Sequence, residues 1–307
     1  MTEQHEVTDN KFDQERQLTI YLTGQCNSNC IMCPESDHQR LYDNGPGAES
    51  IFQQIDQLPD NATNIVVTGG EPTLETDLFF EVMARLKERF NYSDILLLTN
   101  GRSFAAKAMV ERLYLSCPDY LTVAIPIHGP NAEIHDGISR AKGSFRQTCM
   151  GIENLHAHRA AIEIRVVVSR LNCDHLVETA KFIAERFHFA QIVNFIGLET
   201  MGNCAKYLRD VYIDYDEAFV KIKPAAEALI EAGVDVSLYN FPYCTVEPGF
   251  WSLCRNSISP YKIRYSEICE GCDIRDRCGG VFRSTLSIAK PKLTPIHFSL
   301  NTNEAVI

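Results

Sequence analysis

Short runs of β-branched and apolar residues alternate with amphipathic segments over the first two thirds of the chain, and this alternation is what most constrains the fold. The runs have the length and composition of buried strands. In the segments between them apolar residues recur every three or four positions, as in helices packed on one side. Such repeated units build a parallel sheet. The six expected strands cover residues 18–22, 64–68, 95–99, 121–127, 162–168 and 191–196.

Six strand–helix units are too few to close an eight-stranded barrel. We therefore expect an α/β fold of the partial (β/α)6 TIM barrel type, although an open sheet fits the same pattern. The expected division is a polar N-terminal segment, the barrel, a connecting helix and a small cysteine-rich extension, which cover residues 1–15, 16–210, 211–235 and 236–307.

Composition narrows the class of protein. The formal net charge is −11, which argues against nucleic acid as a partner, because a nucleic-acid-binding domain usually carries a clustered basic surface. No apolar run approaches the roughly 18 residues of a membrane span. The N-terminus is polar and acidic, unlike a signal or transit peptide, so we expect a cytoplasmic protein. Twelve cysteines in a reducing compartment favour metal or redox chemistry over disulfides.

Three of the cysteines lie in the segment GQCNSNCIMCPES, directly after the first expected strand: Cys26, Cys30 and Cys33. A structural zinc ion and a fully ligated iron–sulfur cubane each take four protein ligands. Three cysteines in one loop therefore favour a cluster with one iron left open for a ligand. A zinc site completed by a distant residue such as His38 remains the alternative. Because the loop follows a strand, it lies at the carboxyl edge of the sheet, where such folds build active sites.

The second expected strand runs into VTGGEPTL. Two glycines there allow a close approach of backbone to a ligand, and Glu71 adds a negative charge suited to a cationic group such as an ammonium. An ordinary strand–helix turn with an acidic helix cap would have the same composition.

Together, CNSNCIMC and TGGEP resemble the radical SAM superfamily over residues 16–200. The resemblance implies that Cys26, Cys30 and Cys33 hold a [4Fe–4S] cluster whose open iron is chelated by S-adenosylmethionine. It implies cofactor contacts for Gly69, Gly70 and Glu71, the last receiving the methionyl amine. Two further cofactor contacts are expected: Asn100 in TNG after the third strand, and Arg165 in the fifth strand, where a structural ion pair is the alternative.

A second cysteine set occupies CEGCDIRDRCGG and supplies Cys269, Cys272 and Cys278. Cys244 or Cys254 would be the fourth ligand, and the residues alone suit zinc and iron–sulfur equally. The tail resembles the twitch extension of peptide-modifying radical SAM enzymes, the one-cluster counterpart of SPASM extensions. This implies one auxiliary [4Fe–4S] cluster. The phrases PYCTVEPGFW and SISPYK resemble the maturases of His-Xaa-Ser repeat systems and favour Cys244 as the fourth ligand.

The resemblance implies reductive cleavage of S-adenosylmethionine to a 5′-deoxyadenosyl radical, which then modifies a ribosomally made peptide, for example by an oxidative crosslink. It identifies no catalytic acid or base. About 17 residues precede the first strand, so a partner maturase or leader-binding protein is expected to present the peptide. The electron donor would be a flavodoxin or ferredoxin. The alternatives are modification of a small molecule or RNA, and a non-catalytic iron–sulfur or zinc protein.

Overall fold

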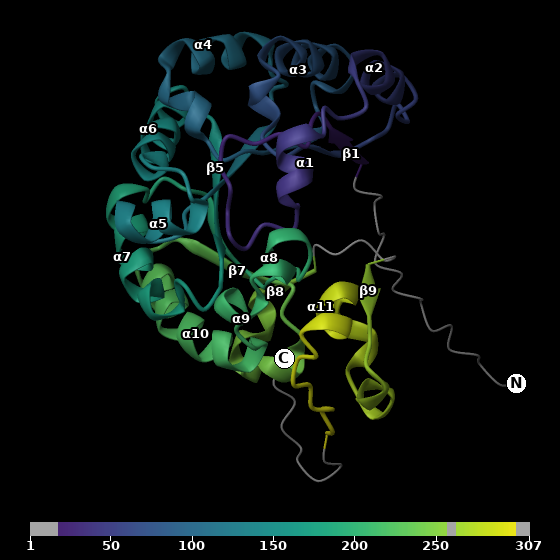
Figure 1. Ribbon diagram of the computed structural model, residues 1–307, viewed down its shortest axis with the longest axis vertical. Helices are drawn as coiled ribbons and strands as arrows, with labels where there is room; N and C mark the ends of the chain where they lie inside the picture. Colours follow the sequence, from purple (N-terminus) through teal and green to yellow (C-terminus); the bar gives the residue numbers. More distant parts are fainter. Residues whose placement is uncertain (1–17, 257–261, 299–307) are drawn as a thin grey trace, which may run out of the picture.

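Eight strands form one parallel sheet, and their order in space is their order in the sequence (Figure 1). The structure is a computed structural model that describes residues 18–256 and 262–298. Neighbouring strands pair in parallel from first to last, and the first and last strands form the two edges. The strands are β1 (Leu18–Tyr21), β2 (Asn64–Thr68), β3 (Asp94–Leu98), β4 (Leu121–Pro126), β5 (Ala161–Val167), β6 (Ile192–Ile196), β7 (Asp235–Tyr239) and β8 (Cys254–Arg255).

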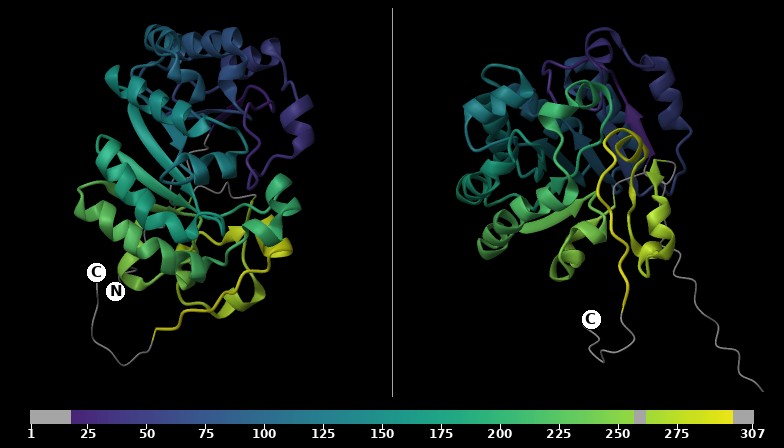
Figure 2. Two further views of the ribbon diagram at one scale, coloured as in Figure 1. Left: turned by 60° about the vertical axis from the view of Figure 1, so that its left-hand side comes forward. Right: turned by 60° about the horizontal axis from the view of Figure 1, so that its bottom comes forward.

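Helices cover one face of this curved sheet, so the molecule is an incomplete barrel with helices outside, as expected (Figures 1 and 2). The longer helices alternate with the strands: α2 (Ala48–Asp56), α3 (Thr76–Phe90), α4 (Lys107–Ser116), α6 (Ser144–Ala157), α7 (Leu176–Arg186) and α10 (Tyr215–Glu231). Shorter helices lie in the loops at the carboxyl edge: α1 (Asp37–Tyr42), α5 (Ala132–Ser139), α8 (Gly202–Lys206) and α9 (Leu208–Val211).

Alternation along the strands separates the core from the inner face of the barrel. In β6, Val193 and Phe195 are buried in the main hydrophobic cluster beneath the helices. Asn194 between them points to the opposite face, because successive side chains of a strand alternate. Its neighbours in register are Arg165 of β5 and Ser237 of β7. The inner face at this side of the sheet is therefore polar.

The sheet is longer than the six expected strands, because β7 and β8 extend it. The sequence of β7, DVSLY, alternates polar and apolar residues over only five positions. Its two apolar core residues, Val236 and Leu238, give little periodic signal. The expected boundary after residue 235 falls within β7, so β7 and β8 lie in the expected extension but belong to the parallel sheet.

The cysteine-rich extension is tied to the barrel through the loop after β6. It contains a two-stranded antiparallel ladder, β9 (Ile263–Arg264) with β10 (Val281–Phe282), and the helix α11 (Arg283–Ile288). Thr285 of α11 is fully buried and donates its hydroxyl to the carbonyl of Leu198 at 3.1 Å. Lys262 and Glu199 form an ion pair at 3.4 Å. Figure 2 shows the extension, in yellow, packed against the part of the molecule that follows β6.

Within the described ranges, no helix has both the length and the apolar character needed to span a membrane.

Candidate active site

The loop after β1 carries Cys26, Cys30 and Cys33 to the carboxyl edge of the sheet, and all three side chains are partly buried. Burial raises the pKa of the Cys26 thiol to about 11. Burial, followed by the charges of the other two thiols, also raises the pKa of Cys30. The three sulfurs therefore lie near enough to repel one another when ionised, and a bound cation would relieve this repulsion.

Two later segments hold this cysteine loop in place. The backbone amides of Asn29 and Ile31 donate to carbonyls at the end of α5, at 2.9 and 3.0 Å. On the other side, the amide of Cys204 in α8 donates to the carbonyl of Cys33 at 3.0 Å. Two sulfurs also accept hydrogen bonds, Cys26 from the Ser28 amide and Cys33 from the Glu35 amide, both at 3.4 Å. Amide donors of this kind stabilise thiolates and suit a cluster ligand.

The glycine pair packs directly on the cysteine loop. The amides of Gly70 and Glu71 donate to the carbonyls of Thr23 and Gln25 at 2.7 and 2.8 Å. A Cβ on Gly69 would lie 2.5 Å from the Thr23 oxygen, and one on Gly70 would meet the Gly24 oxygen still more closely. Both glycines thus serve loop-to-loop packing. Since both remain partly exposed, they can offer carbonyl oxygens to a ligand.

Glu71 is fully buried and joins the loops after β2 and β3. Its carboxylate accepts hydrogen bonds from the hydroxyls of Thr73 and Thr99 and from the Asn100 amide, each at 2.7 Å, and from the Thr73 amide at 3.2 Å. Burial raises the pKa of Glu71, and these donors oppose the rise. The carboxylate is therefore occupied by groups of the chain itself.

Asn100 bridges the loop after β3 and the cysteine loop. Its side-chain nitrogen lies 2.7 Å from Asn27 Oδ1 and 3.9 Å from Cys26 Sγ. Its carbonyl accepts the Thr148 hydroxyl of α6 at 2.9 Å. The predicted contact residue thus reaches the cysteine loop itself.

Arg165 projects from β5 onto the inner face, where its Nε lies 2.6 Å from Glu163 Oε1. The structural ion pair, which was the alternative role for Arg165, is therefore present. The Arg165 side chain keeps 24% of its surface exposed. A second ligand can therefore reach the guanidinium.

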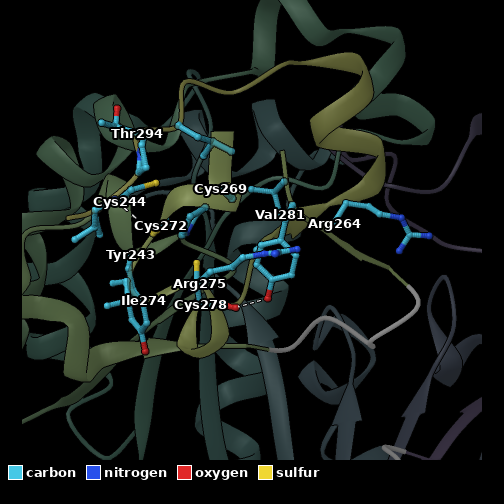
Figure 3. Close-up of a pocket in the computed structure, with 16 residues that line it drawn as sticks. Tyr243, Cys244, Arg264, Cys269, Cys272, Ile274, Arg275, Cys278, Val281 and Thr294 are labelled. Atoms are coloured by element: carbon cyan, nitrogen blue, oxygen red, sulfur yellow. Dashed lines mark hydrogen bonds between the residues drawn. The ribbon is translucent and has the colours of Figure 1, made fainter. Parts of the chain in front are cut away.

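The four cysteines of the extension chosen from the sequence line one hollow (Figure 3): Cys244, Cys269, Cys272 and Cys278. Burial raises the pKa of Cys244, and the charges of the other three cysteines raise it further. The amide of Ile296 donates to Cys272 Sγ at 3.4 Å. Cys244 lies 25 residues before Cys269 in the sequence. The fold of the extension brings it to the other three thiols.

Cys254 lies apart from this set. It does not line the hollow, and it packs against the main hydrophobic cluster, with Sγ 3.9 Å from the carbonyl oxygen of Phe250. Burial, followed by the charge of Cys278, raises its pKa to about 12. The geometry favours Cys244 over Cys254 as a partner of the other three.

In the part of the chain that the structure describes, no three Cys, His, Asp or Glu side chains are close enough to share one metal ion. Four thiolates on one zinc lie about 3.8 Å apart, given Zn–S bonds of about 2.3 Å. In a cubane each thiolate binds a different iron, so the sulfurs stand farther apart. Both cysteine sets supply the thiol ligands that either arrangement takes. His38, the alternative zinc ligand, is exposed on α1.

The structure adds functional candidates that sequence reasoning missed. Arg102 lies beside the cysteine loop, and Asn203 of α8 donates to the Cys30 carbonyl at 3.3 Å. Neither residue belongs to a spaced motif. Arg102 directly follows the TNG segment, and this adjacency was the only available signal.

This chain is similar in sequence to a family of enzymes and to several characterised proteins. A model of the radical SAM superfamily matches residues 20–183. The mycofactocin maturase MftC of Mycolicibacterium smegmatis is 32% identical over 54% of this chain and 41% of that protein. The GTP 3′,8-cyclase of Limosilactobacillus fermentum is 28% identical over 70% of this chain and 64% of that protein. The chain thus spans only part of the length of these relatives.

Among solved structures, Streptococcus suis SuiB bound to the precursor peptide SuiA superposes with a TM-score of 0.59 at 15% identity. The match covers 72% of this chain and 48% of SuiB. At this identity the likeness establishes the partial-barrel fold.

Proposed function

Because this chain belongs to the radical SAM superfamily, we propose that it binds a [4Fe–4S] cluster and S-adenosylmethionine at the carboxyl edge of β1–β3 and modifies a ribosomally made peptide. One observation carries the proposal: the loop that carries Cys26, Cys30 and Cys33 lies against the glycine–glycine–glutamate loop. When bound, the cluster and S-adenosylmethionine supply hydrogen-atom abstraction from an unactivated carbon.

Different residues of the chain would bind different parts of the cluster and the cofactor. Cys26, Cys30 and Cys33 would ligate three irons. The carbonyls of Gly69 and Gly70 would receive the ammonium. Glu71 anchors their loop, and its negative charge favours a cation at this edge.

Two further residues complete this cofactor site. Asn100 would contact the cofactor beside the cluster. Arg165 would hold its carboxylate with the part of the guanidinium that Glu163 leaves exposed.

We further propose that residues 236–307 act as a twitch-like unit in which Cys244, Cys269, Cys272 and Cys278 hold one auxiliary [4Fe–4S] cluster. The support is the shared hollow and the effect of the other three thiols on the pKa of Cys244. Four protein ligands would leave no iron open, which suits electron transfer better than ligation of a substrate. This would fit an oxidative modification such as a crosslink.

A peptide substrate is supported by the fold shared with SuiB, whose structure contains a precursor peptide, and by the similarity to a maturase. The tail favours a role like that of the His-Xaa-Ser maturases. We expect a partner maturase or leader-binding protein and a flavodoxin or ferredoxin as electron donor, all in the cytoplasm. Similarity to GTP 3′,8-cyclase supports a second candidate, a small-molecule substrate.

The test is cleavage of S-adenosylmethionine by anaerobically reconstituted protein reduced with dithionite. We expect 5′-deoxyadenosine and methionine in equal amounts. Stimulation by a synthetic peptide with His-Xaa-Ser repeats, but not by GTP, would support the peptide assignment, and the reverse would support the small molecule. Cluster-loaded protein that cleaves no cofactor would contradict the proposal.

A further inference from the structure

Arg102 binds the cysteine loop through its guanidinium group. Its guanidinium donates to the Asn27 carbonyl at 2.5 Å and to the Ser28 hydroxyl at 3.1 Å. Both acceptors lie in the turn between Cys26 and Cys30. One side chain therefore holds the middle of the segment that joins two of the three proposed cluster ligands.

The packing of α6 explains why Arg102 points there. A Cβ on Gly151 of α6 would overlap the carbonyl oxygen of Gly101, so the helix lies directly against the turn before Arg102. From the same helix, Gln147 accepts a hydrogen bond from Arg102 Nε at 2.8 Å. The guanidinium is thus fixed between α6 and the cysteine loop.

Within residues 18–256 and 262–298, no acidic side chain forms an ion pair with Arg102. Its guanidinium donates hydrogen bonds to three uncharged oxygen atoms, which belong to Asn27, Ser28 and Gln147.

We propose that Arg102 is a positioning residue that fixes the Cys26–Cys30 turn and keeps a positive charge beside the cluster, which raises the cluster's reduction potential. The inference rests on the proposed function, since it requires the cluster at Cys26, Cys30 and Cys33. Net charge and hydrogen bonds near a cluster set its potential, and a nearby cation favours the reduced, more negative state.

A purely structural clamp would also explain the contacts, so the test must change charge without changing shape. Gln147→Glu does this, because a glutamate oxygen can keep the bond to Arg102 Nε while its charge neutralises the guanidinium. Arg102→Lys keeps the charge but loses the paired contacts. Gln53→Glu is the matched control, since it adds the same charge at an exposed position of the outer helix α2.

The readout is the midpoint potential of the iron–sulfur EPR signal that changes when S-adenosylmethionine is added to anaerobically reconstituted protein. This response assigns the signal to the cluster at Cys26, Cys30 and Cys33. We expect Gln147→Glu to disfavour reduction about tenfold, a shift of about 59 mV to lower potential for one electron. Arg102→Lys should stay near the wild type, and Gln53→Glu should not shift.

A loaded Gln147→Glu protein with the wild-type potential would overturn the inference, as would an equal shift in Gln53→Glu. Wild-type protein whose iron–sulfur signal does not respond to S-adenosylmethionine would instead overturn the proposed function. The two failures are therefore distinguishable. Iron content of each variant shows whether the cluster is loaded.

Discussion

At the scale of single residues, Glu71 is a predicted cofactor ligand that the chain itself holds in place. The sequence placed its carboxylate against a cofactor ammonium. In the structure the carboxylate accepts four hydrogen bonds from Thr73, Thr99 and Asn100. It therefore fixes the loops after β2 and β3, whose backbone and side chains face the cysteines.

Glu71→Gln should destabilise the protein and weaken cofactor binding. The new amide would turn its NH2 group toward donors, leaving at least one buried donor without a partner at a cost of about 1–3 kcal/mol. We expect a lower unfolding midpoint in denaturant and reduced affinity for S-adenosylmethionine. Glu75→Gln, an exposed carboxylate a few residues later, is the control and should change neither. An unaltered midpoint in Glu71→Gln would show that the network is unimportant.

Cys244 and Cys254 give a second residue-scale prediction. Cys244 shares the hollow with Cys269, Cys272 and Cys278, whereas Cys254 packs on the main core. Cys244→Ala should therefore lower the iron bound by the extension, and Cys254→Ala should leave it unchanged. Iron and sulfide analysis of reconstituted protein measures this. The opposite ranking would mean that the tail differs from the maturases it resembles.

At the scale of elements, Asp136 organises the connection from α5 to α6. It accepts hydrogen bonds from the amides of Gly143 and Phe145 and from the Ser144 hydroxyl, at 2.6–2.8 Å. Burial alone would raise its pKa, but these donors at the start of α6 lower it below the usual value. Asp136 thus supplies the cap that α6 lacks at its own N-cap residue, Gly143.

Asp136→Asn should lower the stability of metal-free protein in a pH-dependent way. Since the folded pKa is below the unfolded value near 3.9, the stabilisation is complete above that value and is lost as pH falls through the folded pKa. We expect a loss of about 1 kcal/mol at pH 7, modest because Asp136 is partly exposed, and a smaller loss near pH 3. Urea unfolding at both pH values tests this. An equal loss of stability at both pH values would show that the charge of Asp136 does not contribute.

The elements also show what sequence patterns can predict. The strand predicted at 64–68 has the same bounds in the structure, because its run of β-branched and apolar residues is a strong signal. Helix α5 was missed, since eight residues with Gly137 inside give little helical signal. The contacts of Asn100, Arg102 and Asn203 with the cysteine loop depend on loop conformations. No periodicity encodes these.

At the scale of the whole molecule, the two cysteine sets belong to one connected body. The extension reaches the loop after β6 through Thr285 and Lys262, and α8 in the same region bonds to Cys33. The sequence indicated both sets but not this connection, because it forms between residues more than 60 positions apart.

The central claim is that Cys26, Cys30 and Cys33 hold the cluster that acts on S-adenosylmethionine, separately from the cluster of the extension. The most direct measurement compares iron content and 5′-deoxyadenosine formation in wild-type protein and in the variant with all three cysteines changed to alanine. We expect a fall from about eight to about four irons per chain and loss of product, because each cubane holds four irons. Continued cofactor cleavage by the variant, or loss of all its iron, would contradict it.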